Sequence, residues 1–436
     1  MDKLVVEGGR RLEGEVDIAG SKNAVLPVLA AALLTRETLR VENAPRLADV
    51  ESMLGVLRDL GCAVQGGEDE AIEVKAPEHP SQRTDWELVS RMRASFCVLG
   101  PLVARTGRAE VSLPGGCALG GFRPIDIHRK GLEALGASVR TEGGYVIAEA
   151  PPGGLRGAEM YLGTAFGSSV TGTANVMMAA TLAEGRTVIQ GAACEPEVVD
   201  LGRCLQAMGA RIEGLGSPRV EIEGVSELGA VEWSVIPDRI EAGTYVIAGA
   251  MTGGRVRVRG CRPEHLVTVL ERLREAQIPF EVGPDWIETQ ARDPRAAGEQ
   301  PRPTDVTTHP FPGFPTDLQA QWMALMTMAE GRSVITERVY PERYMHMAEL
   351  ARLGADVRRE GALALVSGTP RLSGAHVTAS DLRASAALVL AGLVAEGETH
   401  VHRVYHIDRG YECIEERLRA LGAGIRRERV ERERVE

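Results

Sequence analysis

The chain has 436 residues, about three times the ~150 residues of an average domain, so we expect two large domains or a pair of domains built from repeats. Apolar residues make up 44% of it and charged residues 25%, which excludes a disordered chain and a small disulfide scaffold. The net charge of −11 argues against a general nucleic-acid or membrane-surface binder, although a few arginines could still hold a small anionic ligand.

We expect neither a membrane span nor an export signal. No apolar run reaches the ~20 residues needed to cross a bilayer, and no apolar segment of the signal-peptide kind follows Met1. The seven cysteines are scattered without a CxxC pair, so we expect reduced thiols and a cytoplasmic protein. His402 and His406 lie on a strand-to-loop segment and do not predict a metal site. We expect no metal ion and no cofactor.

Six helices that are apolar nearly all round are predicted along the chain, and such helices are buried in folded proteins. They begin near residues 22, 93, 169, 241, 316 and 381. A turn and a short strand follow. The segment 183–189 (Ala-Glu-Gly-Arg-Thr-Val-Ile) is nearly repeated at 329–335, with looser copies at 106–111, 252–257 and 395–401.

An amphipathic helix, a second glycine turn and a second short strand come next in each repeat. Apolar residues at helical spacing run from Val50 to Leu60, for example. A glycine that can adopt positive φ then ends the helix. It occurs in Leu60-Gly61, Leu135-Gly136, Met208-Gly209, Leu353-Gly354 and Leu421-Gly422, with a degenerate copy at Ala276-Gln277. Three such repeats in each of two α/β domains is the simplest grouping.

Two segments fall outside this pattern. Residues 289–315 contain six prolines and few apolar residues, so we expect a long surface loop there. Residues 426–436 alternate in charge, and we expect a solvated or frayed tail.

Polar residues stand where each buried helix is predicted to begin. Ser, Thr and Asp at such positions usually only cap the helix. Lys22, Arg93 and Arg383 fit that role less well, because a cation opposes the helix dipole there by about 0.3–1 kcal/mol. We therefore expect anionic groups to compensate them. Lys22 does not belong to a P-loop, since the glycine spacing is wrong and Asn23 replaces the Ser or Thr.

The segment from Leu113 to Pro124 holds four glycines around Cys117. Such a loop is exposed, whereas an inert cysteine is normally buried. An exposed thiol beside cations has a lowered pKa and can act as a nucleophile or an acid. A functional and a structural Cys117 are equally compatible with this pattern. The other six cysteines have apolar or helical surroundings and are expected in the core.

Nine stretches of the chain, in order, resemble the UDP-N-acetylglucosamine enolpyruvyl transferases (1-carboxyvinyltransferases). They are Gly20–Ala24, Met92–Ser95, Leu113–Cys117, Arg123–His128, Glu195–Asp200, Pro237–Thr244, Phe314–Gln321, Asp381–Ala386 and Tyr405–Tyr411. The resemblance implies an inside-out α/β barrel of two domains, each with three βαβαββ-type units, and an active site in the cleft between the domains. Residues 22–235 would form one domain, and residues 1–21 with 236–436 the other.

The same resemblance implies transfer of the enolpyruvyl group of phosphoenolpyruvate to the 3′-OH of UDP-N-acetylglucosamine, with release of phosphate, as the first committed step of peptidoglycan synthesis. It implies no protein partner. Asp317 would be the base, and Cys117 the general acid and the thiol that reacts with phosphoenolpyruvate and with fosfomycin. The other implied contacts are Lys22, Arg93, Arg123 and Arg409 around phosphate and carboxylate, with Arg383 nearby; Asn23 on the sugar; Arg123, Pro124, Ile125, Asp126 and His128 on the uridine side; Ser169 and Val170 at the diphosphate; and Val339 and Arg343 on the wall of the second domain.

The chain departs from that family in four places. Cys194 stands where a basic or other residue is common, and the proline-rich segment before Phe314 is expanded. Five residues rather than the usual four separate Cys117 from Arg123, and the neighbours of Ser169 and Val170 differ from the usual ones. Two alternatives stay open. The shikimate-pathway enolpyruvyl transferase shares the fold and mechanism but lacks the Pro-Gly-Gly-Cys loop. A non-catalytic, nucleotide-sugar-sensing paralogue would be expected to lose Cys117 or Asp317.

Overall fold

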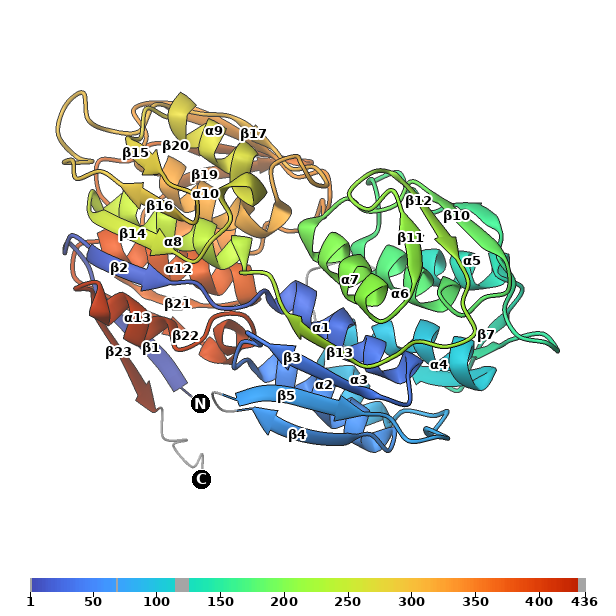
Figure 1. The fold of residues 1–436 in the computed structure, drawn as a ribbon. Coiled ribbons are helices and arrows are strands. Elements are labelled where there is room, and N and C mark those ends of the chain that lie inside the picture. Colours follow the sequence, from blue (N-terminus) through green and yellow to red (C-terminus); the bar gives the residue numbers. More distant parts are fainter. Residues whose placement is uncertain (1, 68–69, 114–124, 430–436) are drawn as a thin grey trace. The chain divides into compact units, whose positions relative to one another are not determined.

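The computed structural model describes residues 2–67, 70–113 and 125–429, with the backbone alone at residues 91 and 93. These residues form two compact units. The first, here called the 20–236 unit, contains the described residues between those positions. The second, the 237–429 unit, also contains residues 2–19. Figure 1 shows the helices and strands of both units.

Three apolar helices lie at the centre of the 20–236 unit, among the residues described. They are α1 (Lys22–Ala31), α4 (Leu99–Thr106) and α6 (Val170–Ala180), with the 3-10 turns η1 (Ala32–Leu34) after α1 and η2 (Arg93–Val98) before α4. Small residues let them approach closely. An added Cβ at Gly100 of α4 would lie only 2.2 Å from the Asn175 carbonyl oxygen of α6.

Small sheets and amphipathic helices cover these central helices (Figure 1). In the described part of the unit the sheets have the strand orders β13 (Val231–Ser234)–β3 (Thr38–Glu42)–β5 (Glu70–Lys75)–β4 (Ala63–Gly67), β6 (Arg108–Ser112)–β8 (Tyr145–Glu149)–β7 (Ser138–Glu142) and β11 (Arg211–Glu213)–β12 (Arg219–Glu223)–β10 (Arg186–Gln190)–β9 (Glu159–Tyr161). The outer helices are α2 (Ala48–Asp59), α3 (Trp86–Arg91), α5 (Asp126–Ala134) and α7 (Pro196–Ala207).

The 237–429 unit repeats this plan. Its central helices are α8 (Arg239–Thr252), α10 (Gln319–Met326), which follows the turn η4 (Thr316–Leu318), and α12 (Leu382–Val394). All thirteen residues of α12 are buried, as its apolar sequence predicts. Nevertheless, no helix within the described ranges has both the length and the apolar character that a membrane crossing requires.

The outer layer of this unit also consists of small sheets and short helices. Its described sheets are β15 (Phe280–Val282)–β16 (Trp286–Thr289)–β14 (Arg255–Arg259)–β2 (Glu13–Asp17), β17 (Val306–Thr307)–β18 (Arg332–Thr336)–β20 (Leu363–Ser367)–β19 (Asp356–Glu360) and β21 (His376–Thr378)–β22 (Glu398–His402)–β1 (Asp2–Glu7)–β23 (Gly424–Arg429). The outer helices are η3 (Pro263–Leu266) with α9 (Val267–Glu275), α11 (His346–Arg352), η5 (Val404–Arg409) and α13 (Ile414–Ala420).

The order of strands in the sheets differs from their order in the chain where the two units connect. β2 directly precedes α1, yet it pairs in parallel with β14, which follows α8. Conversely, β13 precedes α8 but pairs in parallel with β3, which follows α1. β1 lies between β22 and β23, so the first strand of the chain completes a sheet made by the last ones.

The turns after the amphipathic helices have the predicted geometry. Positive φ values between 91° and 110° occur at Gly61, Gly136, Gly209, Gly354 and Gly422. The degenerate copy keeps the same turn without glycine, because Gln277 has a φ of 57° and its N–H donates to the Arg274 carbonyl at 2.9 Å. The turn geometry is therefore a property of the repeat and not of one residue type.

Two predictions are wrong in part. Residues 289–315 are not only a surface loop, since β17 pairs in parallel with β18 and Phe314 is buried. The tail is not frayed from residue 426, because β23 pairs with β1 and buries Ile425 while Arg426 faces solvent. Residues 430–436 lie outside the described residues.

Candidate functional site

The turn η4, directly before α10, carries a carboxylate held between two arginines. Asp317 Oδ1 accepts a hydrogen bond from Arg343 Nη1 at 2.7 Å, and its Oδ2 accepts one from Arg383 Nη2 at 3.0 Å. The side chains of Arg343 and Arg383 are only 7% and 3% exposed, whereas that of Asp317 is 24% exposed. The carboxylate is thus the accessible member of a cluster whose cations are buried behind it.

The charges of this cluster stabilise one another. Burial alone would lower the pKa of each guanidinium. The Asp317 carboxylate, together with Asp381 near Arg343 and with Tyr411 and Asp238 near Arg383, more than offsets burial, so the pKa values of both arginines are raised. Both side chains are therefore permanently cationic. Asp317 also supplies the anion expected near Arg383, which stands in the first turn of α12 where Asp381 caps the helix.

Tyr411 joins the three central helices of the 237–429 unit next to this cluster. Its hydroxyl lies 2.8 Å from Thr244 Oγ1 of α8 and receives hydrogen bonds from Gln321 Nε2 of α10 at 3.2 Å and Arg383 Nη1 of α12 at 3.3 Å. Arg383 is thereby held on both sides. Sequence reasoning placed Tyr411 in a matching stretch but gave it no role, since its three partners come from helices distant in sequence.

Arg409 and Val339 belong to the same unit. Arg409 ends η5 and is half-buried. The next residue, Gly410, approaches α12 so closely that an added Cβ would lie 2.5 Å from Leu382 Cδ2, which places the end of η5 against the start of α12. Val339 is half-buried, and its N–H donates to Glu337 Oε1 at 2.8 Å. Glu337 is a second residue that sequence reasoning did not single out.

The 20–236 unit places a cation in the first turn of its own central helix. Lys22 begins α1, and its Nζ lies 3.2 Å from Oδ2 of Asp49, a buried residue in the first turn of α2. The anion expected beside Lys22 is therefore present. Asn23 follows and is half-buried. Only the general demand for an anion was predictable, because Asp49 is one of several acidic residues in that part of the chain.

His128 is a core residue of the same unit, 4% exposed. Asn175 Oδ1 accepts from the Gly100 N–H, so its amide nitrogen faces the Phe96 carbonyl at 3.1 Å and His128 Nδ1 at 2.9 Å. Nδ1 therefore accepts, and the ring proton lies on Nε2, which is 3.4 Å from Thr171 Oγ1. A uridine contact by His128 stays a prediction. In such a contact Nε2–H would be the hydrogen-bond donor.

The predicted diphosphate and uridine residues of this unit begin two parallel helices. Ser169 caps α6 through the Gly172 N–H at 3.2 Å, and Val170 is its first residue. Added Cβ atoms at Gly172 and Gly131 would meet Ile127 and Val176, so α5 and α6 run side by side in the same direction. Their N-termini therefore lie at one end, together with half-buried Ile125 and exposed Asp126.

Several predicted residues cannot be placed in this geometry. Cys117, Arg123 and Pro124 lie outside the described residues, and Arg93 is placed only as the first residue of η2. The remaining cysteines need one correction. Cys62, Cys97, Cys204 and Cys261 are buried as expected, but Cys194 is half-buried and Cys413 is exposed, because it stands before α13. Burial raises the pKa values of Cys62 and Cys204 to about 12, which makes these thiols inert.

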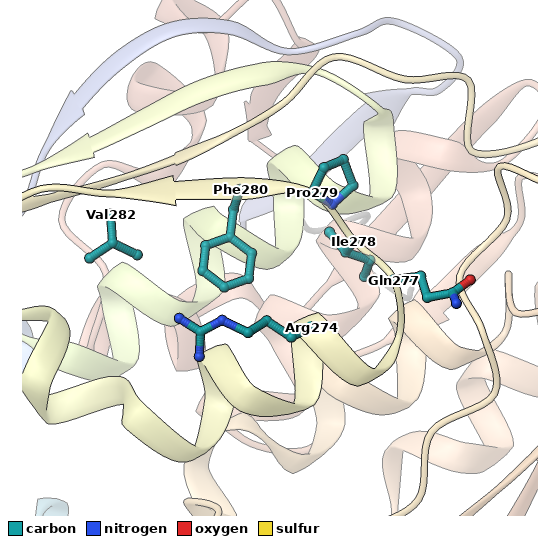
Figure 2. A pocket seen from close by; sticks show the side chains of 6 residues that line it. All are labelled: Arg274, Gln277, Ile278, Pro279, Phe280 and Val282. Atoms are coloured by element: carbon teal, nitrogen blue, oxygen red, sulfur yellow. The ribbon is translucent and has the colours of Figure 1, made fainter.

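A surface hollow of about 430 Å³ lies elsewhere, beside α9 and β15 (Figure 2). Its lining residues are Arg274, Gln277, Ile278, Pro279, Phe280 and Val282, and no predicted site residue is among them. The Arg274 guanidinium is already engaged, since it pairs with Glu271 at 3.1 Å and lies 5.2 Å from the Phe280 ring centroid. Within the described ranges, no group of three or more His, Cys, Asp and Glu side chains could hold a metal ion.

A comparison with protein families shows which family the chain belongs to. The family described as EPSP synthase (3-phosphoshikimate 1-carboxyvinyltransferase) matches residues 6–418. The chain belongs to this family. Its members are enolpyruvyl (carboxyvinyl) transferases, so the residues described above form part of an enolpyruvyl transferase.

Solved structures of enolpyruvyl transferases have the same fold. The enolpyruvyl transferase NikO from Streptomyces tendae is 26% identical, with a TM-score of 0.87 over 99% of both chains. Two structures of EPSP synthase from Acinetobacter baumannii are 17% and 18% identical, with TM-scores of 0.72 and 0.71 over 98% and 99% of this chain and 100% of theirs. The prediction of a two-domain inside-out α/β barrel is confirmed.

An enolpyruvyl transferase must hold the two anionic groups of phosphoenolpyruvate and move protons on and off its substrates. This member of the family offers a cation in the first turn of a central helix in each unit, namely Lys22 and Arg383. It also offers a partly accessible carboxylate, Asp317. Such groups can bind anions and accept a proton.

Proposed function

We propose that this enolpyruvyl transferase moves the enolpyruvyl group of phosphoenolpyruvate to the 3′-OH of UDP-N-acetylglucosamine in the cytoplasm, as the first committed step of peptidoglycan synthesis. The observation that carries the proposal is the accessible Asp317 carboxylate between buried Arg343 and Arg383. Asp317 and Arg383 lie in stretches that resemble the UDP-N-acetylglucosamine transferases, and the same resemblance implies Arg343 on the wall of the second domain. The Pro-Gly-Gly-Cys sequence ending at Cys117 favours the same acceptor.

In the proposed addition step, Cys117 gives a proton to the methylene carbon of phosphoenolpyruvate while the sugar oxygen bonds to C2. Asp317 takes the hydroxyl proton. A carboxylate has about four lone-pair positions, so Asp317 can accept this bond while both arginines stay in place. In elimination the Cys117 thiolate takes a proton back from the new methyl group, the C–O bond to phosphate breaks, and the proton held by Asp317 passes to the departing phosphate. The products are the enolpyruvyl ether and inorganic phosphate, and no other reactant is needed.

The remaining predicted residues have binding roles in this proposal. Lys22, Arg93, Arg123 and Arg409 would hold the phosphate and carboxylate, where developing charge is stabilised by fixed cations. The others would hold the nucleotide sugar: Asn23, Pro124, Ile125, Asp126, His128, Ser169, Val170 and Val339.

One specific observation favours a second acceptor. The family that matches residues 6–418 carries the description 3-phosphoshikimate 1-carboxyvinyltransferase. Shikimate 3-phosphate is therefore the alternative substrate, with the same donor and the same chemistry at C2.

Phosphate release from phosphoenolpyruvate tests both acceptors in parallel reactions. We expect release with UDP-N-acetylglucosamine and none with shikimate 3-phosphate. The reverse result would make the protein a shikimate-pathway enzyme. Release with neither acceptor, from folded protein, would instead support the non-catalytic sensing paralogue. Fosfomycin added to the productive reaction should stop it by alkylating Cys117, and mass spectrometry of the inhibited protein would locate the adduct.

A further inference from the structure

A buried carboxylate lies next to the Asp317 cluster and is not used by the proposed chemistry. Glu337 follows the last residue of β18 and is 0% exposed. Its Oε1 accepts from Thr308 Oγ1 at 2.7 Å and from the N–H groups of Val339 and Tyr340 at 2.8 Å each. Its Oε2 accepts from Thr316 Oγ1 at 2.9 Å. All four of these donors are neutral.

Those four bonds connect Glu337 to three separate segments. Thr308 follows β17, Thr316 begins η4 directly before Asp317, and residues 338–340 lead to Arg343. Burying a carboxylate is costly unless its oxygens are well bonded. A group that can only accept, and that accepts four times, cannot be replaced by an amide without losing bonds. The surroundings of residue 337 thus supply hydrogen-bond donors only, which suits a carboxylate and not an amide.

The hydroxyl of Thr316 connects Glu337 to the Asp317 cluster, and the direction of its hydrogen bonds is fixed. A carboxylate can only accept, so the single Thr316 hydroxyl proton points at Glu337 Oε2. The lone pairs of Thr316 Oγ1 are then left to accept from Arg343 Nη1, which lies 3.1 Å away. The same Arg343 nitrogen donates to Asp317 Oδ1 at 2.7 Å. The order of donation is therefore Arg343 to Thr316 to Glu337.

We propose that Glu337 is a positioning residue of the enolpyruvyl transfer. Through Thr316 it orients Arg343 and so fixes the Oδ1 side of Asp317, and through the 338–340 turn it places Val339. This inference rests on the proposed function. It goes beyond it because Glu337 contacts no substrate and acts only through residues that would.

The first test compares four variants on whichever acceptor the wild-type protein uses. Glu337→Gln places an amide N–H₂ against at least one donor, and Thr316→Val removes the relay hydroxyl. We expect each to lower kcat about ten- to a hundredfold, the scale of a small misplacement of reacting groups, with much smaller changes in KM for phosphoenolpyruvate. Thr316→Ser keeps the hydroxyl and should restore most of kcat.

The matched control is Glu288→Gln. Glu288 is also a buried glutamate of the 237–429 unit, 4% exposed, but its bonds go to Arg255 and Arg257 on β14. This variant should lose stability and keep kcat. The proposal is overturned if Glu337→Gln is folded and keeps kcat within about twofold of wild type, since misplacement should cost about tenfold or more. It is also overturned if Thr316→Ser is as impaired as Thr316→Val.

The second test does not depend on any acceptor, so it separates this inference from the proposed function. Thr316→Val and Arg343→Gln are combined in a double-mutant cycle of urea unfolding, with Glu337 intact and again with Glu337→Gln. We expect the two substitutions to be non-additive with Glu337 intact and additive in the Glu337→Gln background. Additivity in both backgrounds would reject the relay, even if no acceptor were ever turned over.

Discussion

Asp317 has two roles in this protein, one in stability and one in the proposed chemistry. Its two oxygens bind two guanidinium groups that are almost completely buried. A buried cation is tolerated only when it is paired. Asp317 is therefore needed for the stability of the cluster as well as for the proton transfer proposed for it, and the two roles can be separated by substitution.

Asp317→Ala removes both functions. We expect turnover to fall at least about a hundredfold, the usual contribution of a general base, and the free energy of unfolding to fall by about 1–3 kcal/mol because two buried cations lose an acceptor. Asp317→Asn keeps an acceptor oxygen, so it should recover part of the stability but none of the turnover. Phosphate release and urea unfolding measure the two effects. Normal turnover by the alanine variant would leave Asp317 a structural residue only.

His346 gives the stability a pH dependence. It is 1% exposed, and burial, outweighing the nearby Asp381 carboxylate and aided by the Arg343 cation, lowers its pKa to about 4. The unfolded chain, with a pKa near the ordinary 6.5, then binds the proton more readily than the folded protein. The contribution of His346 to stability is therefore complete above about pH 6.5 and is lost as the pH falls towards 4.

The measurement for His346 is urea unfolding between pH 4 and pH 7, for wild type and for His346→Asn. As the pH falls from 7 to 4, we expect the free energy of unfolding of the wild type to decrease by about 3 kcal/mol relative to that of the variant. Other groups titrate equally in both proteins and cancel in the difference. A difference that is constant with pH would mean that His346 has an ordinary pKa in the folded protein.

At the scale of elements, each repeat follows its local sequence. The buried helices were recognisable because they are apolar on every side, and the outer helices because their apolar residues recur on one face, as Val50, Met53, Leu54 and Leu57 do in α2. β17 was missed, since two residues in a proline-rich segment carry no period. The strand after the Leu421-Gly422 turn was expected, but its extension to Arg429 was missed, because residues 426–429 of β23 are all charged.

Gln277 is an element-scale exception that can be tested. It holds the left-handed turn that glycine holds elsewhere, with a φ of 57°, beside the hollow in Figure 2. Gln277→Gly should stabilise the protein by up to about 1 kcal/mol, because glycine adopts this conformation without steric cost. The matched control is Gly61→Ala, at a φ of 91°, which should destabilise it. Thermal unfolding measures both, and a destabilised Gln277→Gly would contradict the argument.

At the scale of the whole molecule, the exchange of strands ties distant parts of the chain together. β2 and β13 each complete a sheet of the unit that the chain is leaving, and β1 lies between β22 and β23. Leu4, Val5 and Val6 of β1 are all completely buried. The first residues are therefore part of a core formed mainly by the last third of the chain.

Removal of residues 1–9 tests this dependence. We expect the amides of β22 and β23 to lose most of their protection against hydrogen exchange, because both strands lose their pairing with β1. The amides of α4 and α6, in the other unit, should keep theirs. Equal loss in both units would show that they unfold as one, and no loss anywhere would show that β1 contributes nothing to the sheet.

The sequence by itself determined the repeat, the kinds of helix, the positions of the turns and the need for anions beside Lys22 and Arg383. These follow from hydrophobic periodicity, glycine and helix polarity, which are properties of neighbouring residues. Only the tertiary structure showed which carboxylates pair with these two cations. Asp49 is 27 residues from Lys22, and Asp317 is 66 residues from Arg383. Such partners, like the exchange of β2 and β13, depend on which helices and strands pack together, and local periodicity carries no record of that.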